Sequence, residues 1–468
     1  MPAGNGFAEY VRERIRKQAG AGVSIDALRQ PAHFGHIPGF CGRINQCNVS
    51  CRWTTRVRLS EIRELLRFRE PMRDRERRRL ESCLNVDDLR HLARQRLPRA
   101  VFDYVDGGAD EEVSLRENRA AFQAWRFVPN SGRDVSAVGV ETELFGREIG
   151  APLALCPTGY TRMLHPQGEL AVARAAFGHS IPYALSTVGT SSIEELVATG
   201  HDNLWFQLYV LRDRGQCRSL LERAAANGFL VLEVAIDTAV SGRRERDVRN
   251  GLTIPPALSL QTLGDIAVHV SYWRSMLGAP ALRFASVDDL SGVGADTVTA
   301  ANTANLFDPS VDWDDLAEIR GWWKGPMLLK GLIGPEDAKR SLSIGIDGIH
   351  LSNHGGRQLD RSLPTAELIR PLREAVGEDA VIVVDSGIRH GADIATAVAL
   401  GADAAAIGRP YLYGLAAGGE RGVDRVLTIL TEQLRRTMQL LGVVSVAELR
   451  EGGIGLLRRS KLGGTLGA

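Results

Sequence analysis

The chain has 468 residues, of which 44% are hydrophobic and 24% charged, and its formal net charge is +1. This composition excludes a chain that is disordered as a whole, and the balanced charge leaves no global field that would attract nucleic acid or anionic lipid. Six cysteines do not make a disulfide scaffold at this length, and no run of about 18 apolar residues is present, so we expect a cytoplasmic protein without a membrane-spanning helix.

The first 84 residues differ in composition from the rest. Residues 52–79 contain 11 arginines and 5 acidic residues, with few apolar positions for a core. We expect residues 1–84 to be a solvated Arg-rich extension, either disordered or an artefact of gene prediction. Two interpretations stay open, namely contact of the arginines with nucleic acid or a membrane surface and a metal site. The candidate ligands of that metal site, whose spacing is unusual for zinc, are His33, His36, Cys41, Cys47 and Cys51.

From residue 85 onward, short apolar runs alternate with helical patterns. Asn85 is expected to cap a helix that begins at Val86. Eight runs are expected strands: 152–157, 182–186, 204–210, 230–236, 326–330, 347–352, 380–385 and 404–408. Helical patterns lie between them, several ending at a glycine. The sequence therefore predicts a (β/α)8 barrel over residues 85–468, with a long insertion after strand four, from Thr238 to Gly325.

Nearly every expected strand ends in a polar residue, and in a parallel barrel these ends line one face. The set is Thr158, Ser186, Gln207, Tyr209, Asp237, Lys330, Ser352, His354, Asp385 and Arg409. The segments "DSGIR" and "IGRP" follow strands seven and eight, where barrels frequently bind phosphate through backbone N–H groups. Arg389 and Arg409 would add charge-assisted hydrogen bonds, so the sequence predicts a phosphorylated ligand.

Several motifs carry a resemblance to a known family. The segments "SNHGGRQLD", "LLKG", "DSGIR", "IGRP", "FQLYV" and "DTAVSGRRERD" resemble those of the FMN-dependent 2-hydroxy acid dehydrogenases and oxidases, and the similarity extends over residues 85–450. "PTG", "LWFQLYV" and "RERDVRNGLTIP" are most similar to the (S)-mandelate dehydrogenase branch. The resemblance implies FMN as cofactor, oxidation of an (S)-2-hydroxy acid, and a homotetramer. It leaves quinone, dye or oxygen as the electron acceptor.

The resemblance also implies roles for individual residues. His354 would be the base that takes the substrate's proton, and Asp237 would orient it, although a strand-end cap is an alternative for Asp237. The substrate contacts would be Tyr104, Tyr209, Arg244, His354 and Arg357, with the two arginines on the carboxylate. The FMN contacts would be Pro157, Thr158, Gly159, Ser186, Gln207, Lys330, Ser352, Asp385, Gly387, Arg389, Gly408 and Arg409.

Two small residues predict a wide substrate pocket. Val188 stands where glycolate oxidase has tryptophan, and Gly159 where many oxidases have alanine, so we expect a bulky or aromatic acid and slow reaction with oxygen. No metal ion or nucleic acid is expected in the barrel, and peripheral contact with the inner face of a membrane stays open. The alternatives are an oxidase that makes hydrogen peroxide, another FMN barrel enzyme such as an isomerase, and a binding protein dominated by residues 52–79. Glu233, inside an apolar strand, has no explanation from the sequence.

Overall fold

The structure is a computed structural model that describes residues 74–250, 268–280, 282–287 and 307–460. The chain divides into two compact units, Met1–Glu70 and Pro71–Ala468, and all described residues belong to the second. The expectations for residues 1–73, including the metal site, lie outside the described residues. The boundary near residue 84 stays a prediction.

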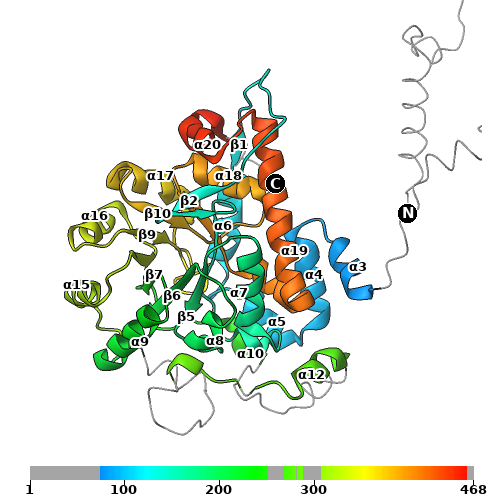
Figure 1. The fold of residues 1–468 in the computed structure, drawn as a ribbon, viewed down its shortest axis with the longest axis vertical. Helices are drawn as coiled ribbons and strands as arrows, with labels where there is room; N and C mark the ends of the chain where they lie inside the picture. Colours follow the sequence, from blue (N-terminus) through cyan, green and yellow to red (C-terminus); the bar gives the residue numbers. More distant parts are fainter. Residues whose placement is uncertain (1–73, 251–267, 281, 288–306, 461–468) are drawn as a thin grey trace, which may run out of the picture. The chain divides into compact units, whose positions relative to one another are not determined.

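Eight parallel strands close into a barrel in chain order (Figure 1). The strands are Leu153–Leu155 (β4), Tyr183–Ser186 (β5), Leu204–Tyr209 (β6), Val231–Ala235 (β7), Met327–Gly331 (β8), Gly348–Leu351 (β9), Val381–Val384 (β10) and Ala404–Ile407 (β11). β11 pairs with β4 and completes the circle. Seven strands lie within the expected runs and β8 ends one residue beyond its run, at Gly331, so the predicted (β/α)8 barrel is confirmed.

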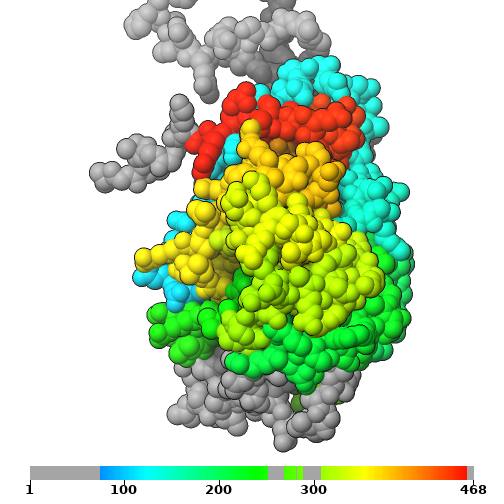
Figure 2. Space-filling view, turned by 90° about the vertical axis from the view of Figure 1, so that its left-hand side faces the viewer, coloured from blue at the N-terminus to red at the C-terminus, as the bar shows by residue number. Residues whose placement is uncertain are grey.

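A helix follows each barrel strand and packs outside it. These helices are Gly168–Gly178 (α7), Ile193–Val197 (α8), Arg214–Ala226 (α9), Trp313–Trp322 (α15), Pro335–Ser343 (α16), Thr365–Val376 (α17), Gly391–Ala399 (α18) and Arg409–Leu441 (α19). Non-helical backbone at Gly418 and Gly419 divides α19 into two segments. Figure 2 views the side on which α15, α16 and α17 lie and shows that they form one continuous surface.

Further helices precede the barrel, and short elements close its ends. The helices are Arg75–Glu81 (α3), Val86–Arg96 (α4), Arg99–Asp106 (α5) and Val113–Gln123 (α6), and Val446–Gly452 (α20) follows α19. Two antiparallel pairs join Trp125–Phe127 (β1) with Leu457–Arg459 (β12) and Thr142–Leu144 (β2) with Arg147–Ile149 (β3). The 3-10 turns are Thr161–Met163 (η2) and Gly453–Leu456 (η3). The side chain of Asn85 accepts a hydrogen bond from the Asp88 amide, 2.8 Å away, which confirms the expected cap of α4.

Apolar side chains fill the amino-terminal half of the barrel interior. Trp205, Val231, Leu328 and Val383 pack there with several alanines. The β2–β3 hairpin contributes to the same cluster, and the ring of Phe145 lies 5.9 Å from that of Trp205. Because this end is packed, polar side chains inside the barrel gather toward the carboxyl ends of the strands.

The insertion after β7 is described in part. It contains the helices Glu245–Arg249 (α10) and Val270–Met276 (α12) and ends at α15. Tyr272 is buried, and its hydroxyl donates to the carbonyl of Met163, 2.8 Å away, which ties α12 to the barrel. No helix in the described ranges is long and apolar enough to cross a membrane.

Candidate active site

A chamber opens at the carboxyl ends of the barrel strands. Its walls include predicted site residues from α5, β6, β8 and α19, and from the loops that follow the barrel strands. They are Tyr104, Pro157, Thr158, Gly159, Tyr209, Arg244, Lys330, His354, Arg357, Asp385, Gly387, Arg389, Gly408 and Arg409. Four other predicted residues lie behind this wall. Ser186, Asp237 and Ser352 form hydrogen bonds with residues that line it, and Gln207 accepts a hydrogen bond from Ser186. The geometry therefore places all of them in one region.

His354 is held between an acid and a phenol. Its Nδ1 lies 3.2 Å from both carboxylate oxygens of Asp237, and its Nε2 lies 3.4 Å from the hydroxyl of Tyr209. An N–H on Nδ1 directed at Asp237 leaves Nε2 as the basic nitrogen, which faces the chamber. Burial, together with the charge of Asp237, raises the pKa of Tyr209, so the phenol stays protonated and able to donate.

The backbone around His354 is strained in a way that fixes the ring. His354 has φ +57°, and Gly355 and Gly356 follow with φ +66° and +72°. The His354 amide donates to Ser352 Oγ and the Gly355 amide donates to Ser386 Oγ, both at 2.9 Å. Such left-handed backbone in a residue with a side chain is typical of functional sites, where the surroundings determine it.

Two guanidinium groups lie against the same aromatic ring. The guanidinium carbons of Arg244 and Arg357 lie 5.5 and 4.9 Å from the ring centroid of Tyr104. Arg244 pairs with Asp247 at 3.0 Å, whereas Arg357 donates, among the described residues, to the backbone carbonyls of Tyr104 and Gly107. Burial, and then the nearby charge of Arg244, lowers the pKa of Arg357. A carboxylate between the two forks would relieve this repulsion and accept hydrogen bonds from both.

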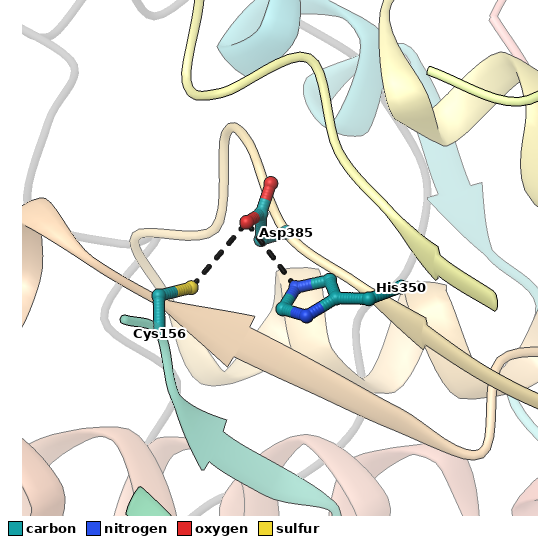
Figure 3. A group of neighbouring side chains, drawn as sticks. All are labelled: Cys156, His350 and Asp385. Carbon is teal, nitrogen blue, oxygen red and sulfur yellow. Dashed lines mark hydrogen bonds and ion pairs between the residues drawn. The ribbon is translucent and has the colours of Figure 1, made fainter. Parts of the chain in front are cut away.

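Lys330 lies at the centre of a buried charged cluster beneath the chamber. Its Nζ lies 2.8 Å from Asp385 Oδ2, an oxygen that also faces Cys156 Sγ at 3.4 Å and His350 Nε2 at 3.2 Å (Figure 3). Cys156, His350 and Asp385 bring three ligand atoms within 4.8 Å of one another. The ammonium of Lys330 already pairs with that oxygen, so a metal ion there would face a fixed cation.

Of the two arginines predicted to bind phosphate, Arg409 is buried and Arg389 is partly buried, and they lie close enough for the charge of Arg389 to affect Arg409. Burial, together with the charges of Arg357 and Arg389 and against the opposing effect of Tyr413, lowers the pKa of Arg409 to about 9. Arg409 donates to the carbonyls of Val105, Gly107 and Gly355, at 2.7–2.9 Å, which uses three of its five N–H groups. An anion here would stabilise the charged form of both arginines, as expected for the phosphate of FMN.

A second observation fits the flavin ring. The amide Nε2 of Gln207 is buried and donates to no described acceptor, while its Oε1 accepts from Ser186 Oγ at 2.8 Å. Ser186 is the last residue of β5 and pairs with Gln207, which lies two residues before the end of β6. A ring carbonyl or nitrogen would satisfy this donor. The residues present therefore fit FMN, with Lys330 near one edge of the ring, where its charge would stabilise the reduced form.

The wall beside Gly159 is largely apolar. Val188 lies against Gly159, and a Cβ on Gly159 would stand 2.6 Å from Val188 Cγ2. The ring of Phe307, from the insertion, packs on Tyr209 with centroids 4.7 Å apart, and both rings line the chamber. The described part of the insertion thus covers the chamber with an aromatic side chain.

Three contributions to the site were not predicted from the sequence. Asp247 follows Arg244 by three residues on α10, a spacing that could have indicated the pair. Phe307 lies in the long insertion, where the sequence pattern gives no position in space. His350, like Glu233, is a polar residue inside an apolar strand. This departure from the apolar pattern could have indicated that the two side chains pair inside the barrel.

Comparisons with known proteins agree with this geometry. Residues 93–455 match the FMN-dependent dehydrogenase family. A Mycobacterium tuberculosis protein named as a presumed L-lactate dehydrogenase is 45% identical over 403 residues, covering 86% of this chain and 96% of that protein. The (S)-mandelate dehydrogenase of Pseudomonas putida is 40% identical over 372 residues, covering 79% and 93%.

A solved structure is similar as well. The crystal structure of the monotopic membrane protein (S)-mandelate dehydrogenase superposes with a TM-score of 0.75 and 37% identity, covering 81% of this chain and all of that one. The barrel, the buried Gln207 amide without a partner among the described residues, and the buried Arg409 agree with the family match over most of the chain. The chain therefore belongs to the FMN-dependent dehydrogenase family.

Proposed function

We propose that the protein oxidises a bulky (S)-2-hydroxy acid to the 2-oxo acid. The observation that carries this proposal is the meeting, in one chamber, of the His354–Asp237 pair with two guanidinium groups and an apolar wall. FMN supplies the two-electron acceptor for the hydrogen on C2. The relatives' names, L-lactate and (S)-mandelate dehydrogenase, support the same class of substrate.

Each protein group has one task in this proposal. Arg244 and Arg357 bind the substrate carboxylate and fix C2 in place. Tyr209 donates to the substrate oxygen, and His354 Nε2 takes the hydroxyl proton as the C2 hydrogen leaves. Asp237 then stabilises the imidazolium. Tyr104 supplies the ring on which both arginines lie.

The base is tested with His354→Asn. The variant should retain its flavin, while the rate of flavin reduction by substrate should fall roughly 10²- to 10⁴-fold, the usual contribution of a positioned base. Flavin absorbance after purification is the control, since it shows that the chamber is intact. Turnover equal to that of the parent would remove His354 from the mechanism.

The substrate and the acceptor are tested in one experiment. Anaerobic bleaching of the flavin by a panel of 2-hydroxy acids identifies the substrate, and reoxidation by oxygen, a quinone or a dye identifies the acceptor. We expect mandelate-like acids to bleach fastest and a quinone or dye to reoxidise faster than oxygen. Stoichiometric peroxide at the turnover rate would favour the oxidase instead, and a flavin that no hydroxy acid bleaches would favour another FMN enzyme.

Peripheral membrane contact forms part of the proposal. Val268, Val270 and Leu277, in and beside α12, are 79%, 62% and 80% exposed, whereas Tyr272 anchors the helix from its other face. The monotopic membrane mandelate dehydrogenase supports the same interpretation. Sedimentation with anionic vesicles should fall when all three apolar residues are changed to serine.

Light scattering tests the tetramer, which rests on family analogy, and cell fractionation tests the cytoplasmic location.

A further inference from the structure

The barrel contains a second acid–histidine pair, deeper than the first. His350 and Glu233 lie on β9 and β7, four residues before His354 and Asp237, which lie in the loops that follow these two strands. In both pairs the histidine contacts the acid through Nδ1, at 3.2 Å for the upper pair and 2.8 Å for the lower. The lower pair is 1% exposed at each member, so it cannot contact substrate.

The lower pair is connected to the chamber through Asp385. His350 Nε2 lies 3.2 Å from the same Asp385 oxygen that Lys330 contacts at 2.8 Å. Lys330 and Asp385 line the chamber, whereas Glu233 and His350 do not. The histidine is therefore the end of the pair nearer to the cofactor, and the carboxylate is the end farther from it.

The charged and titratable groups around His350 come from four other strands. Glu233 lies on β7, Lys330 on β8, Asp385 after β10 and Cys156 after β4. Burial and the charge of Lys330 lower the pKa of His350, but Glu233 and Asp385 outweigh both and leave it above its ordinary value. Burial raises the pKa of Cys156 well above its usual range, so the thiol contributes no charge.

The pair is costly as a purely structural element. A buried ion pair is often no more stabilising than apolar side chains of similar volume, and Glu233 Oε2 has no hydrogen-bond partner among the described residues. Stability alone therefore does not explain it. The position of the pair against Lys330 and Asp385 offers an explanation, because these two residues line the chamber and would adjoin bound FMN, where local charge determines how easily the ring is reduced.

We propose that Glu233 keeps His350 protonated, and that the positive end of this pair, acting through the Lys330–Asp385 pair, raises the reduction potential of the bound flavin. Glu233 and His350 are positioning residues in this proposal, since neither touches the ring. It rests on FMN occupying the chamber. Above the pKa of His350 the extra positive charge is lost, so the potential should fall more steeply as pH rises in the parent than in a protein without the pair.

Sulfite binding to the oxidised flavin measures this charge without any substrate. Sulfite adds to N5 and leaves negative charge at the N1 edge, so its affinity rises with positive charge there. The main variant is the double substitution Glu233→Val with His350→Leu, which leaves no buried polar group unpaired. The matched control is His179→Gln, which removes an acid–histidine pair, with Asp424, that lies outside the chamber walls.

In the double variant, sulfite affinity at pH 6 should be weaker than in the parent by up to about tenfold, because the imidazolium, the nearer end of the pair, is lost, while loss of the more distant Glu233 carboxylate offsets part of that effect. A tenfold change corresponds to about 30 mV for a two-electron couple, and the dye-equilibrated potential should fall by up to that amount. The ratio of the parent's sulfite affinity to that of the double variant should shrink as pH rises. The ionisation of sulfite itself affects both proteins equally and cancels in this ratio. The His179→Gln control should bind sulfite as the parent does.

Glu233→Gln separates a charge effect from packing. Glutamine still accepts from His350 Nδ1, but the carboxylate that raises the histidine's pKa is gone, so the pH at which the advantage disappears should move lower. The proposal would be overturned if the parent and the double variant had equal sulfite affinity and potential, or if Glu233→Gln left the pH profile unmoved. Either result would leave the cofactor assignment and the proposed function intact. A purified protein that binds no flavin would overturn the cofactor assignment, and the proposal with it.

Discussion

The contact between Gly159 and Val188 predicts strong coupling between the two positions. In Gly159→Ala the new Cβ would stand 2.6 Å from Val188 Cγ2 and 3.1 Å from the Val188 carbonyl oxygen. Something must move, and overpacking of this kind typically costs about 1–3 kcal/mol. At roughly 2 °C per kcal/mol for a chain of this size, the melting temperature of the flavin-bound protein should fall by about 2–6 °C.

The same substitution should cost less when Val188 is already alanine. Val188→Ala removes Cγ2 and leaves only the carbonyl contact, so Gly159→Ala in that background should cost below about 1 kcal/mol. The coupling energy of the cycle should then be about 1–2 kcal/mol, within the range for residues in contact. Gly321→Ala is the control, because a Cβ there meets nothing within 4 Å.

Thermal melts of the parent, Gly159→Ala, Val188→Ala, the double variant and the Gly321→Ala control check this prediction. The value of kcat/KM for mandelate and for lactate is measured on the same proteins. Gly159→Ala alone should lower kcat/KM for mandelate more than for lactate, since the displaced valine narrows the wall beside the substituent. Additive melting temperatures across the cycle would refute the reasoning, because they would mean that the two side chains do not meet.

Three other predictions concern the two arginines proposed to bind the carboxylate, the substrate pocket and the ion pairs of Asp106. Arg357→Lys keeps the charge but loses the fork over Tyr104, so steady-state kinetics should show a lower kcat and a higher KM; unchanged constants would place the clamp elsewhere. The ratio of kcat/KM for mandelate to that for glycolate should exceed roughly 100 in the parent, since each buried CH₂ contributes about 0.8 kcal/mol. Val188→Trp should lower this ratio. An unaltered ratio would mean that Val188 does not shape the pocket. Burial raises the pKa of Asp106, but hydrogen bonds from Arg90 and Tyr413 outweigh it and lower the pKa to about 2. This depressed pKa stabilises the fold above about pH 4 and the effect is lost as pH falls toward 2, so Asp106→Asn should cost about 2 kcal/mol in urea unfolding at pH 7 and progressively less below pH 4; a cost independent of pH would contradict this.

The sequence by itself determined the architecture and the neighbourhood of the site. Eight apolar runs between helical patterns were sufficient for a barrel, because strand and helix periodicity and the caps at Asn85 and the helix-ending glycines are local properties. Once the strands are parallel and closed, their polar ends must share one face, and the chamber walls include most of the residues expected there. The assignment of individual roles came from motif resemblance, and those roles stay predictions.

Only the tertiary structure decided which polar groups meet. Glu233 and His350 lie on strands separated by β8, so closure of the barrel, and not any local spacing, brings them to 2.8 Å. Phe307 enters the chamber from an insertion whose path no periodic pattern describes. The van der Waals contact of Gly159 with Val188 likewise depends on how two loops approach each other. Charge, shape and access at this site depend on distances between strands and loops, which one-dimensional patterns of hydrophobicity do not contain.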